Sequence, residues 1–532
     1  MITITSVREP TTAPLEPDKI PTTREPSPVL SLTPHPTHST PPTLAPIFSS
    51  SSPRPSGPAA MRLTATLCLL LVSALHAGAA DRPNILLILG DNWRFPHAGI
   101  LGDPHARTPA FDRIAKEGVL FTHAFNPAPS CSPCRSSLLT GRAVHELGER
   151  ASLWSGFPQD TPVVTQLLRE AGYAIGYQGK PWAPGNAEVS GWKENPVGPK
   201  FAGLEAFLQA RRPGQPFFFW VGNTDTATKA GKRPYLDDAR QAGLDPARLT
   251  IPPELPDCEE VRLDLLNYYG GIIRLDREAA AVLATLEAAG ELDRTLIVYG
   301  SDNGWQMPRG LGNCYDQGSR VPLAVRWGKT APSARKVDAF VNLGDLAPTF
   351  LEAAGLRPPS TMTMRSLTGL LRGEPAAGRE AVFIERERHA DVRHGHLSYP
   401  MRAVRTRDFL YVRNLRPDRW PAGDPDNLFL HGRPFGDVDT TATKDFLLAH
   451  QHDALGRPFF ARIFGKRPRE ELYDLRRDPD QLTDVAADPA YAADLAAQRA
   501  RVDAWMRDTH DPRLDEAYDA WDRFPYYGKA PK

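Results

Sequence analysis

The residues that could carry chemistry are concentrated in one short stretch, residues 131–142, which reads CSPCRSSLLTGR. Prolines before and within this stretch keep the chain extended up to it, and the residues after Arg135 favour a helix. Cys131 is therefore expected just ahead of a helix N-terminus, where free N–H groups and the helix dipole attract anions. Arg135 adds a planar cation suited to oxyanions. The stretch predicts a site for a small tetrahedral anion.

The two cysteines of this stretch also allow three other interpretations. Cys131 and Cys134 could form a redox pair. They could be half of a zinc site, although Cys258 and Cys314 are single cysteines and supply no second pair. The stretch could also be an inert loop. The residues alone leave these alternatives open.

Two pairs of oxygen-bearing side chains follow strands that are predicted to be buried. Asp91-Asn92 comes after the apolar run 84–89, and Asp302-Asn303 comes after the run 295–299. The C-terminal ends of buried strands are where α/β sheets bind ligands. Carboxylate and amide oxygens suit calcium or magnesium rather than zinc. The alternative is that both pairs form ordinary turns.

Strands and helices alternate through residues 81–371, which we interpret as the catalytic domain. The pattern predicts an α/β fold, with a mostly parallel sheet sandwiched by helices. From about residue 372 the helical periodicity fades, so 372–515 is predicted to be a smaller C-terminal α+β subdomain and 516–532 a tail. The clearest elements are strands at 84–89, 217–221 and 295–299, a long helix at 261–286, and helices capped by Thr108-Pro109 and Thr161-Pro162.

The first 80 residues are not expected to belong to the fold. Residues 1–60 are rich in Pro, Ser and Thr and are predicted to be disordered. Residues 61–80 combine Met-Arg, a short apolar run and small residues, which is the pattern of a secretory signal peptide. The simplest interpretation is that translation starts at Met61 and that 1–60 is a mis-called extension; the alternative is an uncleaved anchor. A secreted or periplasmic protein is expected.

Composition limits the classes of partner. The chain has 63 basic and 63 acidic side chains, so its net charge is near zero and no nucleic-acid partner is expected. At 532 residues it exceeds a single compact core, so two domains are expected. The run within 61–80 is too short for a comfortable membrane span, and no other stretch is apolar enough, so no stable span is expected.

The cysteine stretch resembles the signature of type I sulfatases, which belong to the alkaline phosphatase superfamily. Cys-x-Pro-x-Arg followed by Leu-Thr-Gly-Arg matches, as does the order of acidic pair, cysteine motif and Asp-Asn-Gly. The chain is most similar to the heparan N-sulfatase (sulfamidase) branch and its bacterial relatives. Segments 398–402, 471–474 and 509–512 carry that similarity, and the resemblance covers roughly 82–515.

The resemblance implies one modified residue and one bound metal ion. Cys131 would be oxidised to formylglycine, the catalytic residue, by a formylglycine-generating or sulfatase-maturing enzyme. One Ca²⁺ would bind beside it, held by Asp91, Asn92, residue 131, Asp302 and Asn303. The family usually has a second aspartate where Asn92 stands, so this chain keeps an oxygen ligand but loses one charge.

Three positions of the family's sulfate pocket differ here. The usual Gly-Lys-x-His ends in Trp182, the histidine after the Phe-rich strand is replaced by Ala227, and a basic residue is replaced by Leu311. Arg135 and Lys180 keep the family positions, so both are predicted to be catalytic residues that hold the anion. The other predicted substrate-binding residues are Trp182, Asp225, Arg309 and His389. Trp182 could stack on a sugar or only pack beneath the loop. Asp225 and His389 could take over proton transfer, and the alternative for His389 is a plain surface histidine.

The resemblance implies a calcium- and formylglycine-dependent hydrolase that removes sulfate from a sulfated carbohydrate. The substrate would be N-sulfoglucosamine or an O-sulfated sugar of a glycosaminoglycan-like polymer. One alternative is a weakened relative that only binds sulfated glycans, which the missing histidines favour. Another is a phosphoesterase or phosphonate hydrolase of the same superfamily. The intact cysteine motif favours the sulfatase, because a binding protein needs no formylglycine.

Overall fold

A seven-stranded sheet lies at the centre of the computed structural model, which describes residues 82–374, 378–428 and 432–528. The strand order is β3-β4-β1-β5-β6-β2-β7. Within this sheet only β6 runs antiparallel to its neighbours. The predicted mostly parallel α/β sheet is confirmed. The strands are β1 (Asn84–Gly90), β2 (Val119–Phe125), β3 (Ala174–Gly179), β4 (Phe217–Asn223), β5 (Thr295–Ser301), β6 (Leu323–Arg326) and β7 (Arg335–Asn342).

Strand β1 explains why the central strands read as continuous apolar runs. Its alternate side chains enter hydrophobic cores on opposite faces of the sheet, so both faces select apolar residues. Gly90 at its end lies beside Ser301 of β5 and Asn223 of β4. Because these parallel strands end in register, Asp91 and Asp302 leave the sheet at the same edge.

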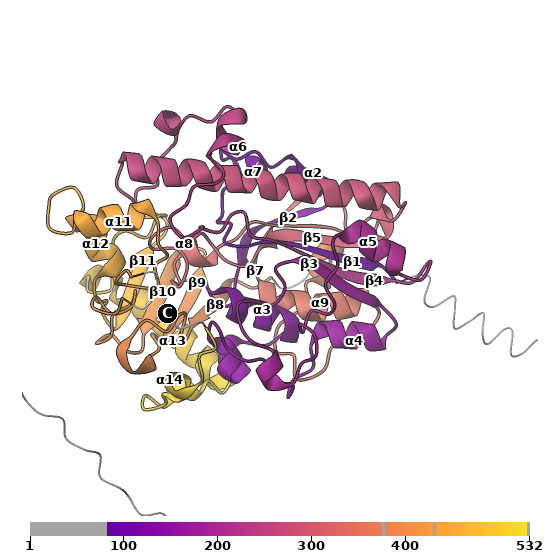
Figure 1. Cartoon of the computed structure of the whole chain (residues 1–532). Helices are drawn as coiled ribbons and strands as arrows, with labels where there is room; N and C mark the ends of the chain where they lie inside the picture. The colour runs from indigo at the N-terminus through magenta and orange to yellow at the C-terminus, as the bar shows by residue number, and fades with distance from the viewer. Residues whose placement is uncertain (1–81, 375–377, 429–431, 529–532) are drawn as a thin grey trace, which may run out of the picture. The chain divides into compact units, whose positions relative to one another are not determined.

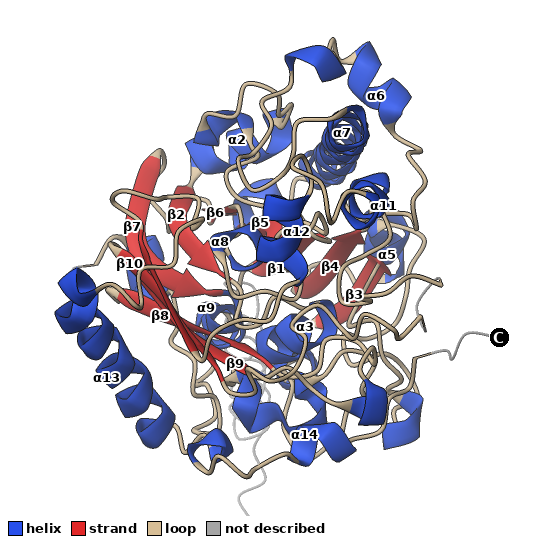
Figure 2. Ribbon diagram, turned by 90° about the vertical axis from the view of Figure 1, so that its left-hand side faces the viewer, coloured by secondary structure: helices blue, strands red, loops and turns tan. Residues whose placement is uncertain are grey.

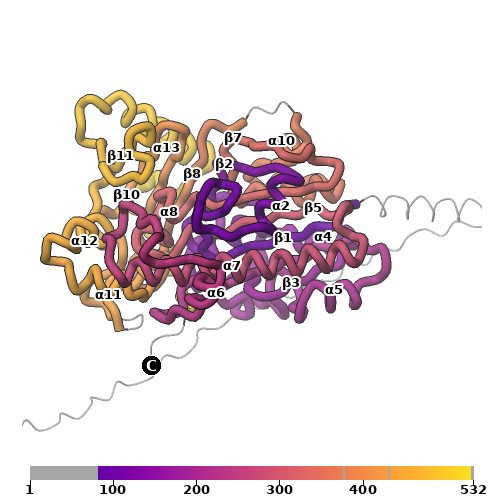
Figure 3. Tube along the Cα trace, turned by 90° about the horizontal axis from the view of Figure 1, so that it is seen from above, coloured from indigo at the N-terminus to yellow at the C-terminus, as the bar shows by residue number. Residues whose placement is uncertain are grey.

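Helices cover both faces of the sheet, with α7 above it and α3, α4 and α9 below it in Figure 1. Seen from above, α7 runs along the strands, with α6 beside it and α11 near its end (Figure 3). The helices of this region are α2 (Pro109–Glu117), α3 (Cys131–Thr140), α4 (Val164–Glu170), α5 (Leu204–Ala210), α6 (Leu236–Gln241), α7 (Glu259–Ala288), α8 (Asp316–Ser319), α9 (Leu346–Ala353) and α10 (Thr368–Arg372).

Two predicted helix starts differ in outcome. Thr108 is the residue before α2 and Pro109 is its first helical residue, as predicted, but the Thr108 hydroxyl donates to Asp112 and makes no capping bond. Thr161 does not cap α4, which begins at Val164 after Val163. The Thr161 hydroxyl instead donates to Asp160 and accepts from two neighbouring arginines. Those tertiary contacts occupy the hydroxyl that would otherwise have capped the helix.

The second sheet is four-stranded and antiparallel, in the order β11-β10-β9-β8. One of its faces packs toward the first sheet through Phe125 and Phe340. Helix α13 lies along the other face (Figure 2), where Trp505 stacks on Phe383 with 4.6 Å between ring centroids. The elements are β8 (Ala381–Arg386), β9 (Met401–Thr406), β10 (Phe409–Asn414), β11 (Glu470–Asp474), α11 (Ala442–Ala449), α12 (Arg457–Phe464), α13 (Ala492–Asp508) and α14 (Ala520–Arg523).

Short 3-10 helices complete the description: η1 (Gly99–Leu101), η2 (Val144–Ala151), η3 (Glu188–Ser190), η4 (Pro246–Arg248), η5 (Leu292–Arg294), η6 (Leu343–Asp345), η7 (His394–His396), η8 (Pro489–Tyr491) and η9 (Pro512–Leu514). The predicted N-terminal extension and signal peptide lie outside the described residues. Within the described ranges, none of the helices combines the length and the apolar character that crossing a membrane requires.

Candidate active site

Three chain segments meet at the C-terminal edge of the central strands and bring the predicted metal ligands together. Asp91 and Asn92 follow β1, Asp302 and Asn303 follow β5, and Cys131 is the first residue of α3. Cys131 Sγ lies 3.4 Å from Asp91 Oδ1, 4.0 Å from Asn92 Oδ1 and 3.7 Å from Asn303 Nδ2. The parallel register and the position of the helix place all five side chains around one point.

Two buried cations hold the carboxylates in place. Arg135, one helical turn after Cys131, donates from Nε to Asp302 Oδ2 at 2.8 Å and has Nη2 3.3 Å from Asp91 Oδ1. Its Nη1 donates to the backbone carbonyls of Lys180 and Pro181 at 3.0 and 2.9 Å. Lys180 Nζ lies 2.6 Å from Asp91 Oδ1. Both predicted catalytic cations therefore contact the acidic ligands.

The two carboxylates ionise differently. Burial opposes the ionisation of Asp91, but the charges of Lys180 and Arg135 outweigh it and hold its pKa well below the usual value. Burial raises the pKa of Asp302 to about 6 despite Arg135, and the nearby charge of Asp91 adds to that rise. A cation bound between the two carboxylates would relieve this repulsion.

The cysteine thiols are poor nucleophiles as they stand. Burial raises the pKa of Cys131, and the charge of Asp91 raises it further. Cys134 is fully buried in the hydrophobic core, and burial raises its pKa as well. Because the thiolate is the reactive form, neither thiol favours redox or nucleophilic chemistry at neutral pH.

The surrounding atoms fit a hard divalent cation. Asn303 Oδ1 and Asn92 Nδ2 are buried and have no hydrogen-bond partner, whereas Asn303 Nδ2 donates to Asn92 Oδ1 at 2.6 Å. The oxygen and nitrogen of an amide are assigned from such contacts, so either side chain can present an oxygen. Together with Asp91 and Asp302 they form an oxygen-rich donor set of the kind that Ca²⁺ prefers.

Trp182 is not at the mouth of a pocket, so the prediction that it stacks on a sugar is not supported. Its side chain is only 2% exposed and packs edge-on against Phe157, with 5.0 Å between ring centroids. Its Nε1 donates to Ser136 Oγ at 2.8 Å. The ring therefore packs beneath the loop and contacts α3 through Ser136.

Arg309 was predicted to bind the anion, but its side chain points elsewhere. Its backbone has a φ of 72°, and its guanidinium lies 4.1 Å from the ring centroid of Tyr315. It donates to the carbonyl oxygen of Gln481 in the second half of the chain. The structure therefore gives this guanidinium partners outside the cluster around Cys131.

His389 and Asp225 lie near the site; one ring nitrogen of His389 and both carboxylate oxygens of Asp225 have hydrogen-bond partners. His389 Nδ1 is 2.8 Å from the hydroxyl of Ser130, the residue before Cys131, and burial lowers the pKa of His389 to about 4. Its ring is neutral at neutral pH. Asp225 accepts from Tyr235 Oη at 2.7 Å and from Arg274 Nε at 3.2 Å. This arrangement makes Asp225 a positioning side chain rather than a free acid.

Two residues near the site were not predicted, and both lie on the loop after β4. Thr226 donates its hydroxyl to the backbone oxygen of Asp91 at 2.8 Å. Lys229 is half-buried, and burial lowers its pKa. The charge of Asp91 raises that pKa, and the charge of Lys180 lowers it. The signal in the sequence was a lysine two positions after Ala227, where the expected histidine is missing.

Comparisons with known proteins agree with this geometry. The sulfatase family model matches residues 83–195 and 200–356. The model of the C-terminal region of N-sulphoglucosamine sulphohydrolase matches residues 309–424. N-sulphoglucosamine sulphohydrolase from Homo sapiens is 30% identical over 499 residues, which cover 84% of this chain and 94% of that protein.

Two solved structures share the fold. One, in complex with its substrate D-glucosamine-2-N,6-O-disulfate, has a TM-score of 0.54 and 19% identity, and the match covers 82% of this chain and 100% of that one. The other, a phosphonate monoester hydrolase of Agrobacterium radiobacter, has a TM-score of 0.57 and 19% identity, covering 80% and 96%. The fold, the family model and the human relative agree: this chain belongs to the sulfatase family of hydrolases and has its alkaline phosphatase-like fold.

Proposed function

We propose that this protein is a calcium- and formylglycine-dependent sulfohydrolase that acts on a sulfated carbohydrate. One observation carries the proposal. A buried cysteine with an unreactive thiol occupies the N-terminus of α3 and is surrounded by two carboxylates and two cations. This arrangement has little use for a thiol, but it suits a residue made from one, next to a divalent cation and an anionic substrate.

The two implied groups would supply chemistry that the unmodified side chains lack. Formylglycine at position 131 would provide, in its hydrated form, an oxygen nucleophile with a second hydroxyl that a serine or cysteine does not have. A calcium ion held by Asp91, Asn92, Asp302 and Asn303 would provide a Lewis acid beside the nucleophile.

The side chains of this chain position and stabilise the reacting group. Arg135 fixes Asp91 and Asp302 through direct contacts and adds a positive charge at the N-terminus of α3. Lys180 presents an ammonium beside residue 131 that can bind a sulfate oxygen. Residue 131 is only 6% exposed, so bulk water is largely excluded and screens these charges weakly.

The choice of substrate rests on the relatives. The human relative is named for N-sulphoglucosamine, and the structural neighbour was solved with a glucosamine that carries both N- and O-sulfate. We propose an N-sulfoglucosamine or O-sulfated sugar of a glycosaminoglycan-like polymer for this chain. A binding protein without activity remains the competing function, because Trp182 is buried and Ala227 carries no charge.

The test begins with the state of residue 131 in protein purified from its native host. Mass spectrometry of the tryptic peptide 117–135 distinguishes formylglycine from cysteine. The same protein is then assayed on N- and O-sulfated glucosamine saccharides, with a phosphonate monoester as the comparison substrate. Formylglycine with sulfate release supports the proposal. An unmodified cysteine supports the binding protein, and faster turnover of the phosphonate supports the phosphonate hydrolase.

Calcium is tested separately with Asp302→Asn, which keeps a hydrogen-bonding partner for Arg135 but removes one anionic ligand. We expect elemental analysis to show one calcium per parent molecule and less in the variant. Equal calcium in both proteins would place the metal elsewhere.

We further propose that the mature protein is exported and begins near Asp81, because residues 61–80 have the pattern of a signal peptide. N-terminal sequencing of the native protein tests this. Detection of residues 1–60 on the mature chain would rule it out.

A further inference from the structure

Lys229 occupies a tight turn on the loop that follows β4. The backbone N–H of Lys232 donates to the carbonyl of Lys229 at 3.1 Å, and the two residues between them have positive φ, 50° at Ala230 and 80° at Gly231. Two successive positive φ values define the compact turn that joins antiparallel segments. Lys229 therefore begins a rigid turn, so the side chain does not sit at a loose loop tip.

The ammonium of Lys229 is oriented but not neutralised. Nζ donates to the carbonyl oxygen of Thr224 and lies 3.4 Å from its hydroxyl. An ammonium has three donors, so one remains for another partner. Throughout the part of the chain that the structure describes, Lys229 forms no ion pair; the nearby carboxylate of Asp225 is held by Tyr235 and Arg274.

This ammonium is carried by the loop that contacts the catalytic cluster. Burial lowers the pKa of Lys229, while the charge of Asp225 and then that of Asp91 raise it and that of Lys180 lowers it. Thr226, on the same loop, is bonded to the backbone of Asp91. That bond ties the loop to the end of β1. Lys180 differs from Lys229 because its ammonium is already paired with Asp91 at 2.6 Å.

We propose that Lys229 binds an oxygen of the sulfate group that is removed, and so supplies the charge that Ala227 cannot. The inference rests on the proposed function, and it assigns a substrate-binding residue to the same site. The free donor of a half-buried cation without a carboxylate partner suits an anionic oxygen that arrives with the substrate. The loop anchored by Thr226 holds that donor on the β4 side of residue 131, where Ala227 also lies.

The test compares Lys229→Met, Lys229→Arg and the parent on a monosulfated saccharide that the parent cleaves. We expect Lys229→Met to lose kcat/KM by at least about tenfold, and Lys229→Arg to recover much of that loss because it keeps the charge. Lys232→Met is the matched control, since this lysine lies at the other end of the same turn and is exposed. Its kcat/KM should stay within about twofold of the parent.

A second readout does not require turnover. Inorganic sulfate is titrated into each protein, and we expect its dissociation constant to rise at least about fivefold in Lys229→Met but not in Lys232→Met. Unchanged melting temperature, calcium content and formylglycine content would exclude a merely structural effect. If the parent is active and Lys229→Met matches it in both kcat/KM and sulfate affinity, the inference is wrong.

Two further outcomes separate this inference from the proposed function. A loss confined to disulfated substrates would overturn the inference, because Lys229 would then bind a sulfate other than the one removed. If the parent cleaves no sulfated saccharide but Lys229→Met still binds sulfate more weakly, the proposed function fails and the binding role of Lys229 stands.

Discussion

Two buried clusters of charged side chains in this molecule resemble each other in composition but not in completeness. The catalytic cluster surrounds residue 131, and the C-terminal network ties the second sheet and the end of the chain to η2. The catalytic cluster consists of Asp91, Asn92, Cys131, Arg135, Lys180, Asp302 and Asn303. The C-terminal network consists of His145, Glu385, Glu387, Arg402, Asp511 and Arg513.

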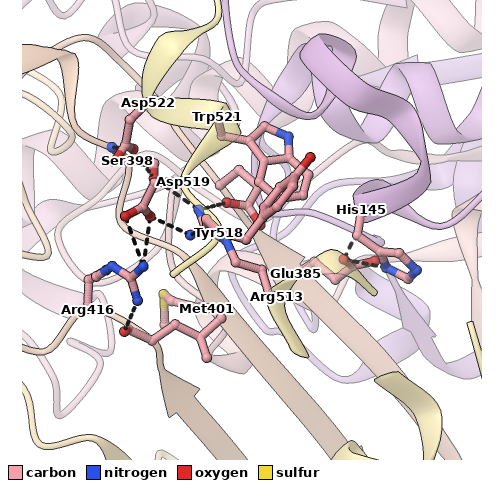
Figure 4. Close-up of polar contacts among 12 residues, drawn as sticks. His145, Glu385, Ser398, Met401, Arg416, Arg513, Tyr518, Asp519, Trp521 and Asp522 are labelled. Carbon is pink, nitrogen blue, oxygen red and sulfur yellow. Dashed lines mark hydrogen bonds and ion pairs between the residues drawn. The ribbon is translucent and has the colours of Figure 1, made fainter. Parts of the chain in front are cut away.

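In the C-terminal network every member has a partner of opposite charge. Arg402 lies between Asp511 and Glu387, at 2.5 and 2.8 Å, and Arg513 contacts Glu387 at 2.7 Å. His145 Nδ1 lies 2.9 Å from Glu385, and its Nε2 lies 3.2 Å from a backbone carbonyl. Figure 4 shows this pairing around His145 and the neighbouring contacts of Arg513. Neither nitrogen of His145 is free for a metal.

The catalytic cluster is incomplete by comparison. Its amide groups leave Asn303 Oδ1 and Asn92 Nδ2 unpaired although both are buried. Burial also raises the pKa of Asp302 to about 6, and repulsion from the carboxylate of Asp91 adds to that rise. Unsatisfied buried polar atoms are costly, so their presence indicates a place for a ligand. The C-terminal network leaves Arg513 Nε unpaired as well, but that atom is a donor beside carboxylates that are already paired. The comparison teaches that an unpaired amide between two carboxylates distinguishes the functional cluster from the structural one better than charge does.

The strongest test of this comparison replaces residue 131. Cys131→Ala should lower kcat/KM by at least about a thousandfold, because no side chain remains to act as a nucleophile. Its melting temperature should change little, since the side chain makes only long sulfur contacts of 3.4 to 4.0 Å. Kinetic assay and thermal unfolding are measured together, with Cys258→Ala as the control because that thiol is half-exposed and immediately precedes α7. Retained activity in Cys131→Ala would remove the basis for a formylglycine.

The complementary test breaks the C-terminal network. Arg402→Met should lower the free energy of unfolding by about 3–5 kcal/mol, because it leaves Asp511 buried without its arginine. Denaturant titration measures this, and protein that remains folded should keep its kcat/KM within about twofold. Arg501→Met, at an exposed position on α13, is the control. A specific loss of activity without loss of stability would contradict the division into two clusters.

Lys180 sharpens the comparison because it belongs to the incomplete cluster yet has a partner. Lys180→Ala should lower kcat/KM by about 30-fold or more, since removing a cation that contacts a desolvated anion costs about 2–5 kcal/mol. Lys193→Ala, an exposed lysine of the same region, should have no effect. Steady-state kinetics on one sulfated saccharide measures both. Parent-like activity in Lys180→Ala would mean that the sulfate site lies elsewhere.

The smallest expected effect concerns pH. Burial opposes protonation of His145, but Glu385 outweighs it and raises the pKa to about 9. Because the folded pKa exceeds the unfolded value of about 6.5, the ion pair stabilises the protein fully below that pH and its contribution is lost as the pH rises toward 9. Between pH 6 and 8.5 the parent should lose about 1–2 kcal/mol more stability than His145→Gln. If the stability of the two proteins changes equally with pH in thermal melting, the assignment is wrong. His452→Gln, which replaces an exposed histidine, is the control.

Much of the catalytic cluster was predictable, because the local sequence pattern shows where each buried strand ends. The apolar runs that end at Asp91 and Asp302 identify buried parallel strands, and such strands end at one edge of a sheet. Cys131 was expected just ahead of a helix, but it is the first residue of α3, because Pro133 is tolerated in the first helical turn. These inferences depend only on periodicity and on residues with strong backbone preferences.

The side chains that we misplaced depend on long-range contacts instead. Trp182 turns inward because Ser136 and Phe157, which lie earlier in the chain, accept it. Arg309 contacts the carbonyl of Gln481, far along the chain. Lys229 was not predicted at all, because its loop is tied to β1 by the bond from Thr226 to the backbone of Asp91. Periodicity carries no information about such orientations, since each is set by residues distant in sequence.

The burial of residue 131 has a consequence for the order of events during synthesis. In the folded chain this residue is 6% exposed and is enclosed by β1 and β5, and Trp521 near the end of the chain bonds to the carbonyl of Gly148 just beyond α3. A maturing enzyme could reach the cysteine only while the chain is still open. Because β1 must wait for β5 to be synthesised, and distant parallel pairing is slow, the topology itself leaves the nascent cysteine accessible until the sheet has formed.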